Sequence, residues 1–179
     1  MKYFQLRQLS KVQPNKSAFS LVELTIIIAL MALIAALTIP SVITFKQQYV
    51  VSELYALQST IWYLQQQAIA ENKQKTILFN SSEHFYESAQ EKHKLSRYVK
   101  FDIIPGVLGP PSHPQKQLKK AFTCKENKLV ITPEGIISPG TIYLVDDKKQ
   151  FLYAITVPIA GVSFTRLYYY RNKQWHVYI

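Results

Sequence analysis

Ala18-Phe19-Ser20-Leu21-Val22-Glu23-Leu24-Thr25 opens an apolar run that continues through Ile26 to Phe45. After Glu23, the next charged side chain in the chain is Lys46. A helix needs about 20 predominantly apolar residues to cross a hydrocarbon core, and this run is long enough. The sequence therefore predicts a transmembrane helix that carries everything after it as a soluble head.

The segment before this run is basic and contains no acidic residue. Its four positive charges come from Lys2, Arg7, Lys11 and Lys16. The positive-inside rule predicts that this leader stays in the cytoplasm and that the head crosses the membrane. An uncleaved signal anchor and a cleaved secretory signal both fit the charge pattern. The apolar run is longer than a usual signal-peptide core, although its small residues offer an A-x-A-like end.

Glu23 is unusual because it lies at the edge of an otherwise uncharged run. A carboxylate inside a spanning helix costs about 2.5–3.5 kcal/mol on insertion scales, so such a group usually has a partner. In one interpretation, Glu23 lies at the membrane interface and reaches water. In the other, the chain is cut before Phe19, and the new α-amine neutralises the carboxylate of a neighbouring copy.

The stretch Lys16-Ser17-Ala18-Phe19-Ser20-Leu21-Val22-Glu23-Leu24 resembles the leader and cleavage site of type IV prepilins and of type II secretion pseudopilins. The resemblance implies that prepilin peptidase cuts between Ala18 and Phe19 and then methylates the Phe19 amine. It also implies that Glu23 guides assembly into a helical filament. Pro40 lies where many pilins carry a proline that kinks the helix.

A second helical pattern follows Pro40. Apolar residues recur there at spacings of three and four, which is one stripe of a helix. We expect this stripe to pack on the chain's own head rather than in a coiled coil, and we expect the helix to end near residues 71–73. The stripe consists of Val50, Leu54, Leu57, Ile61, Leu64 and Ala68.

The remaining residues read as short strands separated by turns. The predicted fold is α+β: a long N-terminal helix, half transmembrane and half amphipathic, packed on an antiparallel β-sheet head. Residues 129–144 further resemble the GspH/FimT group of the pilin family. The expected parts are the leader (1–18), the transmembrane half-helix (19–46), the amphipathic half-helix (47–73) and the head (74–179). The expected strands are 76–79, 84–86, 98–104, 128–132, 136–137, 141–145, 151–157, 163–170 and 175–179.

We find no catalytic set in the sequence, and we predict neither an enzyme nor a cofactor. The four histidines are scattered without metal-ligand spacing, so no metal site is predicted. Cys124 is the single cysteine, which excludes an internal disulfide, and we expect its thiol to be inert rather than activated by the basic residues around it. Asp146 and Asp147 are interpreted as a solvated turn rather than a calcium site.

Basic residues beside aromatic ones raise a second hypothesis, DNA binding by phosphate contact and base stacking. The formal net charge is +10, of which the leader supplies four. From Lys148 onward there are five basic residues and no acid, among several aromatic side chains. Some FimT-type pilins are thought to bind DNA in this terminal segment. The candidates are Arg166, Arg171 and Lys173, although core aromatics beside solvated lysines would give the same pattern.

The function expected from these features is structural. The chain resembles a minor pseudopilin that is held in the bacterial inner membrane and built into a periplasmic type II secretion filament, close to its tip. The implied partners are other pseudopilins, prepilin peptidase and an inner-membrane assembly platform. The alternatives are a minor type IV pilin that binds DNA for uptake, and a signal-anchored periplasmic enzyme whose N-terminal match is a coincidence.

Overall fold

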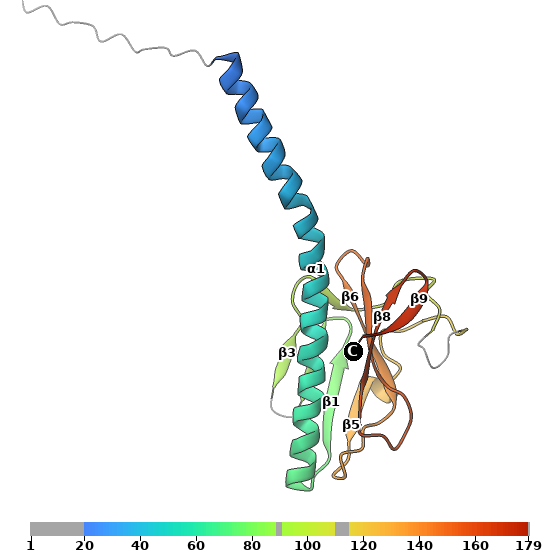
Figure 1. Cartoon of the computed structure of the whole chain (residues 1–179). Coiled ribbons are helices and arrows are strands. Elements are labelled where there is room, and N and C mark those ends of the chain that lie inside the picture. Colours follow the sequence, from blue (N-terminus) through green and yellow to red (C-terminus); the bar gives the residue numbers. More distant parts are fainter. Residues whose placement is uncertain (1–19, 89–90, 110–114, 179) are drawn as a thin grey trace, which may run out of the picture. The chain divides into compact units, whose positions relative to one another are not determined.

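The computed structural model describes residues 20–88, 91–109 and 115–178, except for the side chains of residues 37–44. These residues form an α+β structure in which the long helix α1 (Leu21–Glu71) precedes two antiparallel sheets and a short 3-10 turn, η1 (Lys125–Asn127) (Figure 1). The predicted α+β class with antiparallel strands is confirmed. The chain divides into two units after Pro40, and α1 runs through both.

α1 is 51 residues long and continues through Pro40, as predicted. Asn72 stops the helix because it adopts a left-handed backbone conformation, with φ 50°. The amide of Asn72 then donates to Ile69 O at 3.3 Å, and the amide of Lys73 donates to Ala68 O at 3.1 Å. These two bonds form a Schellman motif, which satisfies the last helical carbonyls. The predicted end near residues 71–73 is therefore confirmed.

The apolar stripe on the second half of α1 is buried against the head. Its six residues are 0 to 3% exposed, and they share one hydrophobic core with residues of both sheets. The prediction that this stripe packs on the chain's own head is confirmed. The core side chains that the sheets contribute include Ile77, Leu129, Ile142, Tyr153 and Leu167.

The first sheet has four strands in the order β3-β2-β1-β5. A hairpin joins β1 (Lys75–Asn80) to β2 (Phe85–Ser88), as predicted. Asn80 fixes its turn, because its Oδ1 accepts hydrogen bonds from the amides of Ser82 and Glu83, both at 2.9 Å. The other strands are β3 (Lys92–Lys94), which the sequence pattern did not predict, and β5 (Lys128–Ile131).

The second sheet has five strands in the order β4-β6-β7-β8-β9. Of these, β6 and β7 are buried on both faces. Alternate residues such as Ile142 and Leu144 point into the core shared with α1. Tyr143 and Val145 point to the other face, where Val107 and Leu118 cover them. The strands are β4 (Val99–Phe101), β6 (Gly140–Asp146), β7 (Leu152–Val157), β8 (Arg166–Arg171) and β9 (Gln174–Tyr178). β4 and β8 are shorter than the predicted runs.

Asp146 corrects the prediction of a solvated turn between β6 and β7, because its side chain is completely buried. The carboxylate accepts hydrogen bonds from the amides of Gln150 at 2.6 Å, Phe151 at 2.7 Å and Lys148 at 3.2 Å. These three backbone donors replace the hydrogen bonds to water that the buried carboxylate has lost. Asp146 therefore holds the β6–β7 turn from the inside.

Replacing a stripe residue tests how strongly α1 is attached to the head. We expect Leu57→Ala to lower the free energy of unfolding by about 2–5 kcal/mol, because it removes a fully buried side chain and leaves a cavity. Denaturant titration of the full chain in detergent micelles, followed by near-UV circular dichroism, measures this loss. Ser59→Ala, at an exposed position of the same helix, should change stability by no more than about 0.5 kcal/mol. Equal effects of the two changes would contradict the burial of this face.

Candidate functional site

The start of α1 is closed by a reciprocal pair of hydrogen bonds between Ser20 and Glu23. The amide of Glu23 donates to Ser20 Oγ at 3.1 Å, and the amide of Ser20 donates to Glu23 Oε2 at 3.4 Å. This is a capping box, which satisfies amides that have no partner inside the helix. Its Ser-x-x-Glu signature is visible in the sequence, but our interpretation of Glu23 as a membrane carboxylate missed it. The predicted cleavage residues Ala18 and Phe19 lie outside the described residues.

The first turns of α1 expose apolar side chains on every side of the helix. From Leu21 to Ile34, the large apolar residues are 42 to 82% exposed. An exposed apolar surface of this extent marks a site that lipid or another protein covers. The residues are Leu21, Val22, Leu24, Ile26, Ile27, Ile28, Leu30, Met31, Leu33 and Ile34.

Over the described part of the chain, no helix has both the length and the apolar composition that a membrane crossing requires.

The second half of α1 is fixed to the head by polar contacts beside its apolar stripe. Lys46 forms an ion pair with Asp147, with Nζ 2.8 Å from Oδ1. Gln47 Nε2 donates to the hydroxyl of Tyr153 at 2.8 Å. Glu53 accepts a hydrogen bond from the amide of Ser96 at 2.9 Å. These bonds span 43 to 106 residues of sequence, so they hold the helix at a fixed register on the head.

Gln65 makes the most buried of the polar contacts described for α1. Its side-chain amide donates to the carbonyl of Gly135 at 2.7 Å and to the carbonyl of Ser163 at 2.8 Å. Gly135 has φ 78°, a left-handed backbone conformation that favours glycine. Gln65 is not part of the predicted apolar stripe, and the spacing of that stripe gave no signal of this contact.

The three predicted DNA-binding residues do not form one patch. Arg166 and Arg171 occupy opposite ends of β8, five residues apart. Because side chains alternate along a strand, they also point to opposite faces of the sheet. The guanidinium of Arg166 lies over the Phe164 ring, 5.3 Å from its centre. Lys173 is in the β8–β9 turn, so it is close in sequence and space only to Arg171.

The C-terminal aromatic residues mainly pack against one another. Tyr178 meets Tyr153 edge-on at 5.6 Å between ring centres, and Tyr169 stacks on His176 at 5.0 Å. Tyr168 is buried in the core on the other face of the sheet. These rings therefore stabilise the second sheet and do not present a row of free faces for nucleic-acid bases.

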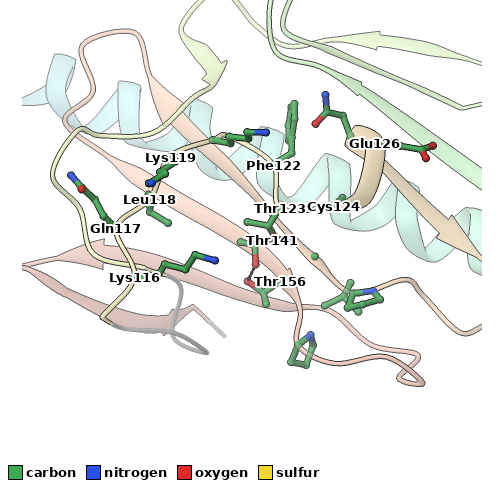
Figure 2. Close-up of a pocket in the computed structure, with 16 residues that line it drawn as sticks. Lys116, Gln117, Leu118, Lys119, Phe122, Thr123, Cys124, Glu126, Thr141 and Thr156 are labelled. Carbon is green, nitrogen blue, oxygen red and sulfur yellow. Dashed lines mark hydrogen bonds between the residues drawn. The ribbon is translucent and has the colours of Figure 1, made fainter.

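A cleft of about 810 Å³ lies beside the first half of β6 (Figure 2). Three lysines line it, Lys116, Lys119 and Lys120, and Figure 2 shows that the Lys116 side chain extends toward the Thr141 and Thr156 hydroxyls. Those hydroxyls are 3.2 Å apart and bond to each other. Glu126 also lines the cleft, but it is paired with Lys128. The cleft is therefore basic and suits an anion. The three lysines can be read from the sequence, but the sequence does not show that they line one cleft.

Cys124 lies at the wall of this cleft and is 6% exposed. Burial raises the pKa of its thiol to about 11. This raised pKa agrees with the expectation of an inert thiol, because an activated thiol needs a lowered pKa. No cluster of three or more potential metal ligands occurs among residues 20–88, 91–109 and 115–178.

No family model, curated protein or solved structure matches this chain.

We expect Cys124 to resist a thiol reagent in the folded chain. With a pKa of about 11, only about one thiol in a thousand is ionised at pH 8, and the sulfur is also shielded. Reaction with Ellman's reagent should release one equivalent of chromophore only after denaturation. An added surface thiol, Ser59→Cys, is the control and should react promptly in the folded chain. Prompt labelling of Cys124 itself would contradict its burial.

The Lys46–Asp147 pair makes the attachment of α1 sensitive to acid. The hydrogen bond from Lys46 lowers the pKa of the Asp147 carboxyl below its ordinary value of 3.8. The pair therefore stabilises the fold above that ordinary pKa and loses its effect as the pH falls through the lowered pKa. Asp147→Asn should lower the free energy of unfolding by roughly 0.2–1 kcal/mol at pH 7. Denaturant titrations across pH should show this difference shrink as the pH falls below 3.8 and through the lowered pKa; a difference that does not shrink on acidification would contradict the ion pair.

Proposed function

We propose that this chain is a minor pseudopilin, a structural subunit of the periplasmic filament of a type II secretion system. One observation carries the proposal: a carboxylate, Glu23, begins a helix whose first turns expose apolar side chains on all sides, while the second half of the same helix is buried in the head. A helix that is apolar all round requires a lipid or protein environment. A helix whose first turns are apolar and exposed, and whose second half is buried in the head, suits a subunit that leaves a membrane to join a bundle of helices.

In this proposal, residues 21–36 are first covered by lipid and later by the same segment of neighbouring subunits. The uncharged run extends in sequence to Phe45, beyond the part whose side chains are described. The head and the second half of α1 move together because their contacts, such as those of Gln65, are internal. The chain's work is packing, and it transforms no substrate.

The carboxylate of Glu23 has two oxygens for two tasks. Oε2 accepts the hydrogen bond from the Ser20 amide. Cleavage between Ala18 and Phe19 would create an amine four residues before Glu23, and Oε1 can accept a bond from such an amine in a neighbouring subunit. Pairing of the two charges would reduce the cost of keeping the carboxylate in lipid.

The proposed location is the bacterial inner membrane, with a single pass, a cytoplasmic N-terminus and a periplasmic head. Prepilin peptidase would remove residues 1–18 and methylate Phe19, and an inner-membrane platform would move the subunit into the filament. Pro40 would allow the membrane half of the helix to bend relative to the half that the head holds.

Two substitutions at Glu23 separate its charge from its capping role. Glu23→Ala removes both, whereas Glu23→Gln removes the charge and keeps a side chain that suits a capping box. We expect both variants to insert into the membrane at least as well as the natural chain. We also expect both to lose most incorporation into the filament, measured by cross-linking to neighbouring subunits. Normal incorporation of Glu23→Gln, with failure of Glu23→Ala alone, would show that capping and not charge is what assembly needs.

The processed N-terminus is the control for this experiment. Mass spectrometry of chain taken from native membranes should give a product that begins at Phe19 with one added methyl group, in the natural chain and in both variants. A product that still begins at Met1, or one that begins beyond Ala36, would contradict the proposal itself.

A minor type IV pilin that binds DNA is the second candidate function, and the basic cleft is the observation that favours it. Lys116, Lys119 and Lys120 lie together and line a surface cavity, unlike Arg166, Arg171 and Lys173. Phosphate contacts by lysine give salt-dependent binding that does not depend on sequence.

A DNA retardation assay tests this candidate. If the chain binds DNA through the cleft, changing Lys116, Lys119 and Lys120 to Glu should abolish retardation, because the three charges meet the phosphates together. The matched triple, Arg166, Arg171 and Lys173 to Glu, makes the same change in net charge and should leave most retardation intact. Absence of salt-sensitive retardation by the unchanged chain would eliminate DNA binding, without affecting the filament proposal.

A further inference from the structure

The two sheets end in four edge strands, and the edges differ in how they are protected. β3 carries Lys92 and Lys94, and β4 is only three residues long and includes Lys100. The outer side of β5 is covered, because the amide of Ser138 donates to Val130 O at 2.8 Å. Lysines, short length and cover are the usual means by which proteins prevent a sheet edge from pairing with another chain.

β9 has none of these protections. Its sequence, Gln-Trp-His-Val-Tyr, contains no proline, lysine or acidic residue. It is the last strand of the five-stranded sheet, and among the strands that the structure describes it pairs with β8 alone. Val177 is 65% exposed at this edge. Within the described part of the chain, β9 is therefore the edge open to another strand.

The register of the β8–β9 hairpin shows which backbone groups are free. Arg171 pairs with Gln174 across a two-residue turn, so these residues exchange hydrogen bonds, and so do Tyr169 and His176 two positions on. Trp175 and Val177 alternate with these hydrogen-bonded residues along β9, so their amides and carbonyls point away from β8. No backbone hydrogen bond involves these groups in the described structure.

The open edge is held in place by contacts on both faces of the sheet. The indole of Trp175 donates to Leu108 O at 3.0 Å on one face. On the other face, the Tyr178 ring meets the Tyr153 ring edge-on. A strand that is already ordered loses little conformational entropy when a partner binds to it.

The charge around β9 limits the kind of partner that fits. Arg171 and Lys173 are both exposed at the turn that leads into β9. No acidic residue follows Asp147 in the sequence, and neither cation forms an ion pair among the described residues. A strand that adds to this edge in the antiparallel sense would bring its C-terminal end beside these two cations.

We propose that β9 binds an extended segment of a partner protein, which joins the second sheet as a sixth, antiparallel strand. The segment alternates apolar and polar residues and carries carboxylates at its C-terminal end. Trp175 and Val177 supply the backbone hydrogen bonds, and Arg171 and Lys173 meet the carboxylates. This contact goes beyond the proposed filament role, because helix packing through α1 does not use β9.

The test measures binding of a defined peptide to the full chain in detergent micelles. The probe is a fluorescein-labelled peptide of alternating Val and Thr that ends in two Glu, and its binding is followed by fluorescence anisotropy. A second peptide of the same sequence, with N-methyl groups on alternate amides, cannot donate the backbone hydrogen bonds that would join it to β9. Val177→Pro removes an outward amide without breaking the hairpin, whereas Val177→Thr keeps that amide and serves as its matched control.

The peptide should bind, and Val177→Pro should weaken its binding by about tenfold, as expected for the loss of an edge hydrogen bond together with steric interference by the ring. Val177→Thr should change the Kd by less than about threefold. Hydrogen exchange should slow at the amides of Trp175 and Val177 when the peptide binds, while the amide of His176 is protected throughout. The inference is overturned if the peptide does not bind, if the N-methylated peptide binds equally well, or if both variants weaken binding alike. Circular dichroism verifies that each variant is folded, and membrane cross-linking through α1 reports separately on the filament proposal.

Discussion

Burial of one apolar stripe of α1 holds the two sheets together. Each sheet contributes side chains to the core around residues 50–68 of the helix. Polar contacts on both sides of the stripe then set the register, from the Lys46–Asp147 pair at one end to Gln65 at the other. The second half of the helix is therefore an integral part of the head, whereas the large apolar side chains from Leu21 to Ile34 are exposed.

Helical periodicity was sufficient to predict the stripe, because a spacing of three and four specifies one face whatever that face meets. Most hairpins were equally readable from their turn residues. β3 was missed because Lys92-His93-Lys94 has neither an apolar pattern nor strand propensity, and its pairing with β2 is what makes it a strand. Asp146 was misplaced because its hydrogen-bond donors are backbone amides of its own turn, which composition does not reveal.

Some features of the candidate sites could likewise be predicted from the sequence, and others could not. Ser20 and Glu23 are three residues apart, so their capping box could have been predicted from the sequence. The alternation of side chains along β8 likewise implies that Arg166 and Arg171 point to opposite faces of the sheet. The cleft was beyond prediction, because residues 116–127, 139–141 and 156–158 become neighbours only through the sheet. The open edge at β9 likewise depends on strand order, which a list of strands does not supply.

The order of elements along the chain has a consequence for synthesis. α1 precedes the strands that cover it, and core partners such as Tyr153 and Leu167 are translated about 100 residues after the stripe. Contacts of such long separation form late and slowly. The apolar stripe of α1 therefore stays uncovered until the last hairpins are complete, and an apolar surface exposed during folding makes the emerging chain prone to aggregation.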